Sequence, residues 1–191
     1  MDTPAKIVDG LLVLQYQAGN KKALSLLVKR WHLKLCKQAF WYTNDQDVAK
    51  DIVQDCWSII LKKIAGLKDT NSFGSWALTI VNRKAIDWLR KEKNADKKLQ
   101  SYYNDSKISY DAIENNTTGT NEAIFTNPDT TNIVKSAIEK LPKNQQIIIK
   151  MFYLEAYKMN EISTILGVSV GTVKSRLFYA REKLKSQIKI R

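Results

Sequence analysis

The sequence predicts an all-α protein with two small helical domains, an N-terminal helical bundle and a C-terminal helix-turn-helix domain, joined by a flexible linker. Near both ends of the chain, apolar residues recur every three or four positions, which is the pattern of amphipathic helices. In residues 99–132 this periodicity fades, and Asn, Thr, Ser, Asp and Gly dominate. We therefore expect folded domains at residues 1–98 and 133–191, with the linker between them.

Charge divides the chain in the same way. The 191 residues carry a net charge of +12. Residues 1–98 hold 18 Lys and Arg against 10 Asp and Glu, residues 99–132 hold 1 against 5, and residues 133–191 hold 12 against 4. One basic segment is usually only a solvated surface, but two helical basic blocks that contain aromatic residues favour a polyanion as partner.

The composition does not predict a membrane protein, a metalloprotein or an enzyme. No apolar run approaches the ~20 residues that a membrane span needs, and the N-terminus does not have the form of a signal peptide, so we expect a cytoplasmic protein. Cys36 and Cys56 lie in apolar helical contexts and are expected to be free, buried thiols. His32 is the only histidine, and no nucleophile or acid–base partner lies near it in the sequence. We therefore predict no catalytic residue, metal site, cofactor or small-molecule substrate.

The N-terminal domain is expected to contain four helices. Short segments rich in Gly, Asn, Asp or Ser separate stretches with helical periodicity. These stretches predict helices over residues 7–18, 21–42, 46–64 and 76–93. Asn20 is expected to cap the second helix, because its side-chain oxygen can accept from an unpaired backbone N–H.

The third predicted helix has an apolar face and an acidic face. Its polar side is formed by Asp47, Asp51, Gln54 and Asp55. On composition alone, this side is equally well explained as a solvated surface with carboxylates near a helix N-terminus or as a docking surface for a cationic partner.

The C-terminal domain is expected to end in a helix-turn-helix. Helices are predicted over residues 133–141, 143–154, 159–166 and 170–184, with Gly167 in the last turn and Ser169 as N-cap. In the final helix Val173, Leu177, Ala180 and Leu184 form a core-facing stripe. The other residues offer cations, hydroxyls and aromatic rings suited to phosphates and base edges, and they are Gly171, Thr172, Lys174, Ser175, Arg176, Phe178 and Tyr179. From periodicity alone, an ordinary antiparallel helix pair is an equally good explanation.

Leu141-Pro142 and the run Val170–Arg176 resemble the last helix-turn-helix of bacterial sigma factors of the extracytoplasmic-function (ECF) group, in the sigma-70 family. The resemblance implies that helix 170–184 reads a −35 promoter element. We expect specificity from Lys174, Ser175, Phe178 and Tyr179, with Thr172 and Arg176 nearer phosphates. The segment DIVQDCW is similar to the family's docking segment for the β′ clamp of RNA polymerase. This similarity points to Asp51, Gln54 and Asp55, with Asp47 close by.

Residues 73–93 resemble the segment that reads and melts the −10 element, which implies contacts from Phe73, Trp76, Asn82, Arg83, Lys84 and Arg90. Aromatic rings stack on exposed bases for ~1–3 kcal/mol each, and basic residues hold phosphates. Phe73 and Trp76 are better explained as supports of the loop than as direct stacking residues. Asp87 is expected to orient a neighbouring Arg or Lys.

The chain departs from the family's pattern at two places. Asn82-Arg83 stands where the family usually has Arg then Asn, which puts particular base contacts at −10 in doubt. Ala156 stands where the family favours Gly, and Lys158 where it favours a Ser or Thr cap. The helix at 159–166 is therefore expected to begin without a strong cap, at a cost of ~1 kcal/mol.

The resemblance implies an ECF-type sigma factor that directs RNA polymerase to specific promoters. The expected partners are core RNA polymerase, through its β′ clamp and β flap, promoter DNA, and an anti-sigma factor. The two promoter elements lie about two helical turns, or ~70 Å, apart. The alternative is a stand-alone helix-turn-helix regulator that acts without polymerase, which leaves residues 1–98 unexplained. A basic nucleic-acid enzyme is less favoured, because no metal-ligand cluster accompanies the single histidine.

Overall fold

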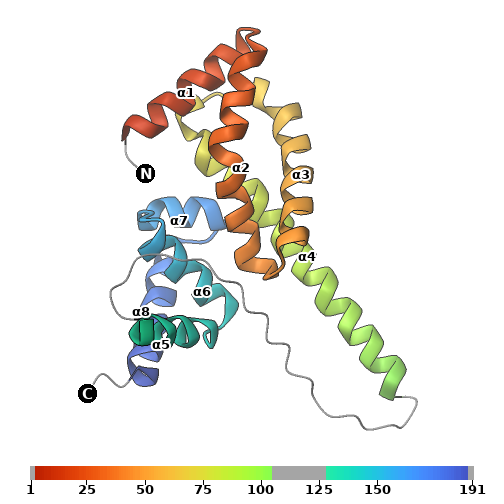
Figure 1. Ribbon diagram of the computed structural model, residues 1–191, viewed down its shortest axis with the longest axis vertical. Coiled ribbons are helices and arrows are strands. Elements are labelled where there is room, and N and C mark those ends of the chain that lie inside the picture. The colour runs from red at the N-terminus through yellow and green to blue at the C-terminus, as the bar shows by residue number, and fades with distance from the viewer. Residues whose placement is uncertain (1–2, 105–127, 189–191) are drawn as a thin grey trace.

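The computed structural model describes residues 3–104 and 128–188. Within them the chain forms helices and no strand, which confirms the all-α prediction (Figure 1). The N-terminal half contains α1 (Thr3–Gln17), α2 (Lys21–Thr43), α3 (Gln46–Lys63), the short 3-10 turns η1 (Ile64–Gly66) and η2 (Thr70–Ser72), and α4 (Phe73–Asn104). The C-terminal half contains α5 (Pro128–Glu139), α6 (Lys143–Ile149), the π-helical η3 (Lys150–Leu154), α7 (Met159–Leu166) and α8 (Val170–Gln187).

The N-terminal helices pack around α2. Its apolar stripe at Leu27, Trp31 and Leu35 is fully buried against α1, α3 and α4. The start of α2 follows the predicted cap, because Asn20 Oδ1 accepts from the Lys22 N–H (3.1 Å). Helix α3 begins in the same way, with Asp45 Oδ1 accepting from the Asp47 N–H (2.8 Å). Side-chain oxygens thus satisfy the backbone donors that the first helical turn leaves unpaired.

Helix α4 is longer at both ends than the sequence predicts. It begins at Phe73 rather than at residue 76, and it continues to Asn104 instead of ending near residue 93. The added C-terminal turns contain good helix formers such as Ala, Lys, Leu and Gln, which outweigh the polar character that predicted an early end. Residues 105–127 of the predicted linker lie outside the described residues.

The C-terminal half follows the prediction at α7 and α8 and departs from it before them. The single helix predicted over residues 143–154 is α6 followed by one π-helical turn. Gly167 joins α7 to α8 with φ +65°, a conformation that costs glycine nothing, and the Ser169 Oγ accepts from the Thr172 N–H (3.1 Å). Helix α7 is better capped than expected, because Glu161 Oε2 accepts from the Lys158 N–H (3.0 Å).

The two halves lie against each other. Helix α7 packs on α4, α6 approaches α2, and the buried apolar residues of both halves form one continuous core (Figure 1). Among the described residues, no helix has the length and apolar character that crossing a membrane requires.

Candidate nucleic-acid and polymerase interfaces

Helix α8 has a buried face and an accessible face, as its periodicity predicts. Of the predicted core-facing stripe, Val173, Leu177 and Ala180 are buried, and Leu184 is half-buried. On the opposite side Lys174 and Ser175 are exposed, and Phe178 and Tyr179 expose 59% and 62% of their surface. Gly171 is also exposed, while Thr172 and Arg176 are half-buried. The predicted reading residues of α8 therefore lie together on one accessible surface.

An aromatic cluster that the sequence did not predict lies beside this surface. The Arg181 guanidinium lies 5.7 Å from the ring centroid of Phe152 and 5.6 Å from that of Tyr153, so it bridges α8 and η3. Within the π-helical η3, Tyr153 and Leu154 are exposed. Such contacts fix the orientation of α8 relative to the preceding helices.

Helix α4 distributes its predicted DNA-binding residues differently. Arg83 and Arg90 are exposed, and Trp76 and Lys84 are half-buried. Phe73 is completely buried and packs edge-on against Trp31 with ring centroids 5.9 Å apart, which favours the supporting role expected for it. Asp87 Oδ1 lies 3.7 Å from the Arg90 guanidinium, so the neighbour expected for it is an arginine one turn along the helix.

Asn82 is buried, with 1% of its surface exposed. Its Oδ1 accepts from Gln38 Nε2 of α2 (2.8 Å), and its Nδ2 donates to the carbonyl oxygen of Ile165 in α7 (3.2 Å). In this arrangement Asn82 faces the C-terminal half of the protein rather than solvent. A contact between Asn82 and DNA stays a prediction that requires the two halves to separate.

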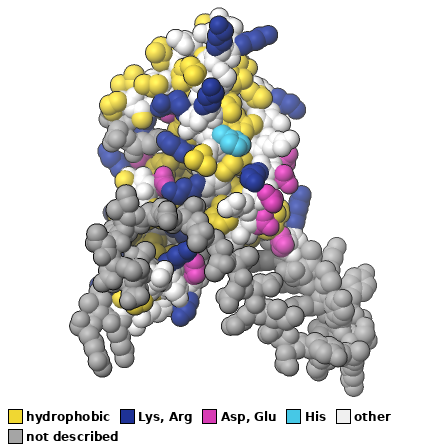
Figure 2. Space-filling view, in the orientation of Figure 1, with side chains coloured by type: hydrophobic (Ala, Val, Ile, Leu, Met, Phe, Trp, Pro, Cys, Tyr) yellow, Lys and Arg dark blue, Asp and Glu magenta, His cyan; other side chains and the backbone are white. Residues whose placement is uncertain are grey.

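The acidic side of α3 is fully accessible. The four predicted polymerase-binding residues are exposed, and they are Asp47, Asp51, Gln54 and Asp55. Figure 2 shows acidic side chains gathered along the edge of the molecule where α3 runs. Two lysines moderate this charge, because Lys50 Nζ lies 2.9 Å from Asp47 and Lys84 Nζ lies 3.6 Å from Asp55. The latter pair connects the acidic face to α4.

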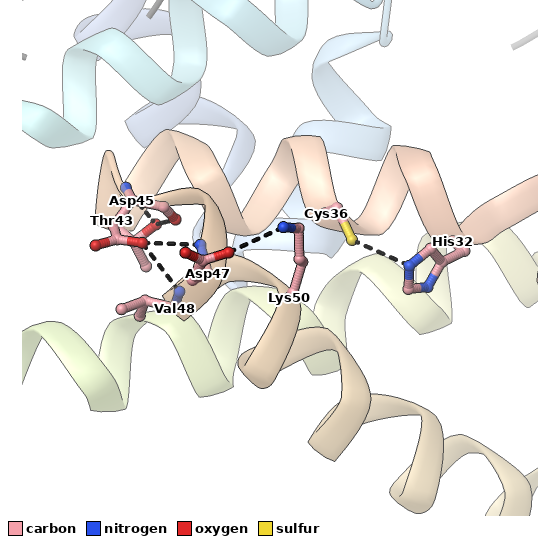
Figure 3. A network of polar contacts seen from close by, with 7 residues as sticks. All are labelled: His32, Cys36, Thr43, Asp45, Asp47, Val48 and Lys50. Carbon is pink, nitrogen blue, oxygen red and sulfur yellow. Dashed lines mark hydrogen bonds and ion pairs between the residues drawn. The ribbon is translucent and has the colours of Figure 1, made fainter.

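Close to this face, His32 joins a polar network on the surface between α2 and α3 (Figure 3). Trp57 Nε1 donates to His32 Nδ1 (3.3 Å), so the neutral ring carries its hydrogen on Nε2, which faces Cys36 Sγ at 3.6 Å. Burial raises the pKa of Cys36, and it raises that of Cys56 to about 12. Both thiols are free, but only Cys56 is fully buried, so the expectation that both are buried is wrong for Cys36.

The described residues contain no group of three or more His, Cys, Asp or Glu side chains placed to hold a metal ion. A basic helix-turn-helix with an accessible reading helix, beside a bundle with a second basic aromatic helix, defines a DNA-binding protein with two modules.

Comparison with known sequences specifies this class. Residues 27–95 match the family description Sigma-70 region 2, and residues 131–184 match Sigma-70, region 4. Together these matches cover most of the chain. The chain belongs to the sigma-70 family, and it is an ECF-type sigma factor that directs RNA polymerase to promoters for transcription initiation.

The sequence similarity to known proteins extends over almost the whole length of the chain. The chain is 28% identical over 190 residues to the ECF RNA polymerase sigma-E factor of Haemophilus influenzae, covering 96% of each chain. It is 27% identical over 188 residues to the factor of the same name in Escherichia coli strain K12, covering 96% of this chain and 95% of that one.

Two solved structures share the fold. One is CnrH in complex with the cytosolic domain of CnrY (TM-score 0.63, 20% identity, 94% of this chain and 96% of that one). The other is the sigma factor RpoE in complex with the anti-sigma factor NepR from Bartonella quintana (TM-score 0.63, 21% identity, 88% and 98%).

Proposed function

We propose that this sigma factor reads a −35 element with the accessible face of α8. The observation that carries this proposal is the exposure of Lys174, Ser175, Phe178 and Tyr179 on one side of a helix whose other side is buried. Lysine can donate to the O6 and N7 acceptors of guanine, and aromatic rings contact thymine methyl groups. Thr172, near the helix start, and the half-buried Arg176 would contact phosphates, and Gly171 lies on the same accessible surface.

The −10 element is assigned to the loop and helix that begin at Phe73. Arg83, Lys84 and Arg90 supply cations for the phosphates of a melted strand, and Trp76 is the aromatic residue of the set that keeps some exposure. Phe73 acts from within the core as a support for Trp76, whose ring centroid lies 6.1 Å away.

The acidic face of α3 is the proposed docking surface for core RNA polymerase. Asp47, Asp51, Gln54 and Asp55 offer carboxylate and amide oxygens to a cationic helix of the β′ clamp. The C-terminal module is the one that would meet the β flap. Two solved relatives of this fold are complexed with anti-sigma factors or a cytosolic partner domain, which supports an anti-sigma partner for this chain as well.

The assignment divides the chain into a polymerase-binding and −10-binding module (1–98), a connector (99–132) and a −35-binding module (133–191). The first and last residues of the connector belong to α4 and α5. The protein works as a binding factor without catalytic activity of its own, in the cytoplasm and on the nucleoid when polymerase carries it. Its ligands are macromolecules, and no cofactor takes part.

Run-off transcription tests this proposal. The purified protein is added to core RNA polymerase on a pool of genomic DNA fragments, and new transcripts are mapped. We expect transcripts from a limited set of start sites that share sequences near −35 and −10. Transcripts that are identical with and without the protein would contradict the proposal and favour the stand-alone regulator.

A further inference from the structure

Arg181 is an exposed cation on the side of α8 that carries reading residues, although the proposed −35 contacts do not include it. It follows Lys174 by seven positions and Phe178 by three, which is the spacing of one helix face. A helix-turn-helix brings the first residues of its second helix to the base edges. Arg181 lies about 10 Å farther along the helix axis than Lys174. Because the major groove is about 12 Å wide, this position falls near the phosphates that border the groove.

Two aromatic rings support the Arg181 side chain. The carbon of its guanidinium lies 5.7 Å from the ring centroid of Phe152 and 5.6 Å from that of Tyr153, within the ~6 Å range of a cation–π contact. The two rings meet edge to face, with centroids 5.1 Å apart. Phe152 is half-buried against the apolar core, whereas Tyr153 exposes 55% of its surface. The guanidinium therefore rests on a pair of rings that is anchored in the core.

These rings hold the guanidinium without neutralising it. A ring face attracts a cation but brings no negative charge to it. Within the described residues, the guanidinium makes no hydrogen bond or ion pair in addition to its two ring contacts. The neighbouring carboxylate, Glu182, lies 2.9 Å from Lys185 instead. Arg181 therefore keeps N–H donors for an external anion, and a guanidinium can donate two parallel hydrogen bonds to a phosphate group.

We propose that Arg181 is a further DNA contact of this sigma factor, which binds a backbone phosphate beside the −35 element, and that Phe152 and Tyr153 position it. A long arginine side chain loses conformational freedom when it binds, and the rings remove part of that loss in advance. A phosphate contact adds affinity without reading sequence, and it fixes how α8 lies in the groove. The inference rests on the proposed assignment of α8 to the −35 element.

The salt dependence of promoter binding tests the Arg181 contact. Holoenzyme is titrated onto a fluorescent promoter fragment that run-off transcription has identified, at about 50 and 200 mM salt. Arg181→Gln should bind about tenfold more weakly than the wild type at the lower salt concentration. Because losing one phosphate contact lowers the salt slope by about 0.9, this difference should shrink about 3.5-fold at the higher one. Equal binding, or a deficit that salt leaves unchanged, would overturn the proposal.

Lys183→Gln is the matched control, because it removes the same charge from an exposed position on roughly the opposite side of α8. It should weaken binding by less than about twofold. A loss as large as that of Arg181→Gln would show a general charge effect and contradict the contact. Retention on immobilised core polymerase should be the same for Arg181→Gln and the wild type. Loss of retention would assign Arg181 to the polymerase and also contradict the proposal.

Two variants of Tyr153 test the positioning role of the rings. Tyr153→Leu removes the ring but keeps an apolar side chain, so it should weaken binding about threefold in the wild type and not at all in Arg181→Gln. Tyr153→Phe keeps the ring and should bind like the wild type. Equal losses from Tyr153→Leu in both backgrounds, or weaker binding by Tyr153→Phe, would show that Tyr153 acts independently of Arg181.

Lys174→Ala separates this inference from the proposed function. A base contact loses its value on a fragment whose −35 sequence is scrambled, whereas a phosphate contact contributes equally on both fragments. Lys174→Ala should therefore weaken binding to the matched fragment alone, and Arg181→Gln should weaken binding to both. If neither variant changes binding, the assignment of α8 to the −35 element is contradicted. If only Lys174→Ala does, the Arg181 contact alone is contradicted.

Discussion

Helices α8 and α4 are both basic, both contain aromatic residues and are both assigned to DNA, yet they expose their reading residues to different extents. Lys174, Phe178 and Tyr179 of α8 lie on a free surface, whereas Phe73 and Asn82 of α4 are buried. The difference arises from neighbours rather than from the helices themselves. Helix α8 has one packed face, while α4 is packed by its own bundle and is also covered by α7. The residues assigned to the −35 element are thus exposed in this structure, whereas Asn82, assigned to the −10 element, is covered by α7.

The largest expected effect is on folding stability, and it should differ between a buried phenylalanine of α4 and an exposed one of α8. Phe73→Ala should lower the free energy of unfolding by about 3–5 kcal/mol, because it leaves a cavity beside Trp31 in the core. Phe178→Ala should change it by less than about 0.5 kcal/mol, because the ring is mostly exposed. Urea denaturation followed by circular dichroism measures both. Equal stability changes would show that the two rings do not differ in role.

Lys174→Ala should weaken promoter binding by about 1–3 kcal/mol if the lysine contacts a guanine edge. Holoenzyme binding to the same promoter fragment at matched salt measures this effect. Lys183→Ala, which removes an exposed lysine later in α8, is the control for charge alone. If the Lys174→Ala variant and the wild type bind the promoter equally, the lysine has no reading role.

Two turns in the C-terminal half form a matched pair of backbone conformations. Ala156 has φ +52° and Gly167 has φ +65°, both in the left-handed region that costs a residue with a Cβ atom about 1–2 kcal/mol. Ala156→Gly should therefore stabilise the protein by about 1 kcal/mol, and Gly167→Ala should destabilise it by a similar amount. Thermal unfolding measures both shifts. A loss of stability in Ala156→Gly would show that the turn is not strained.

A pH dependence is expected at the interface of the two halves. Burial and the nearby charge of Lys150 lower the pKa of Lys143 from 10.5 to about 8. The folded state is therefore penalised below pH 8, where Lys143 is charged, and the penalty disappears as the pH rises from 8 to 10.5. The wild type should gain stability relative to Lys143→Met between pH 7 and pH 9.5, as measured by urea denaturation at each pH. A constant difference would show that Lys143 keeps its ordinary pKa.

Local sequence rules account for most of α8 and for the caps. The stripe Val173, Leu177 and Ala180 is buried as its spacing predicts, and Asn20 and Gly167 adopt the cap and turn conformations that their chemistry favours. These features depend on residues within a few positions of one another. Periodicity and capping chemistry are therefore enough to predict them.

The burial of Asn82 could not be predicted in this way, because its partner lies 83 residues along the chain. A polar residue in a basic helix is ordinarily solvated, and only the docking of α7 makes it an interface residue. The π-helical turn at η3 was missed for a related reason. Its sequence has ordinary helical periodicity, and the extra residue in the turn is shown by a backbone hydrogen bond from the Glu155 N–H to the Lys150 carbonyl oxygen (3.2 Å), five residues back. The one sequence signal at the interface was the departure from the family's order at Asn82-Arg83.

The central claim is that this chain recruits RNA polymerase through the acidic face of α3. Retention of the purified protein on immobilised core polymerase tests it most directly, with Lys174→Ala as the control that leaves this face intact. We expect the wild type and Lys174→Ala to be retained, and the triple variant Asp51→Ala, Gln54→Ala, Asp55→Ala to be lost while keeping its helical circular dichroism spectrum. Failure to retain the wild type, or full retention of the triple variant, would contradict the account.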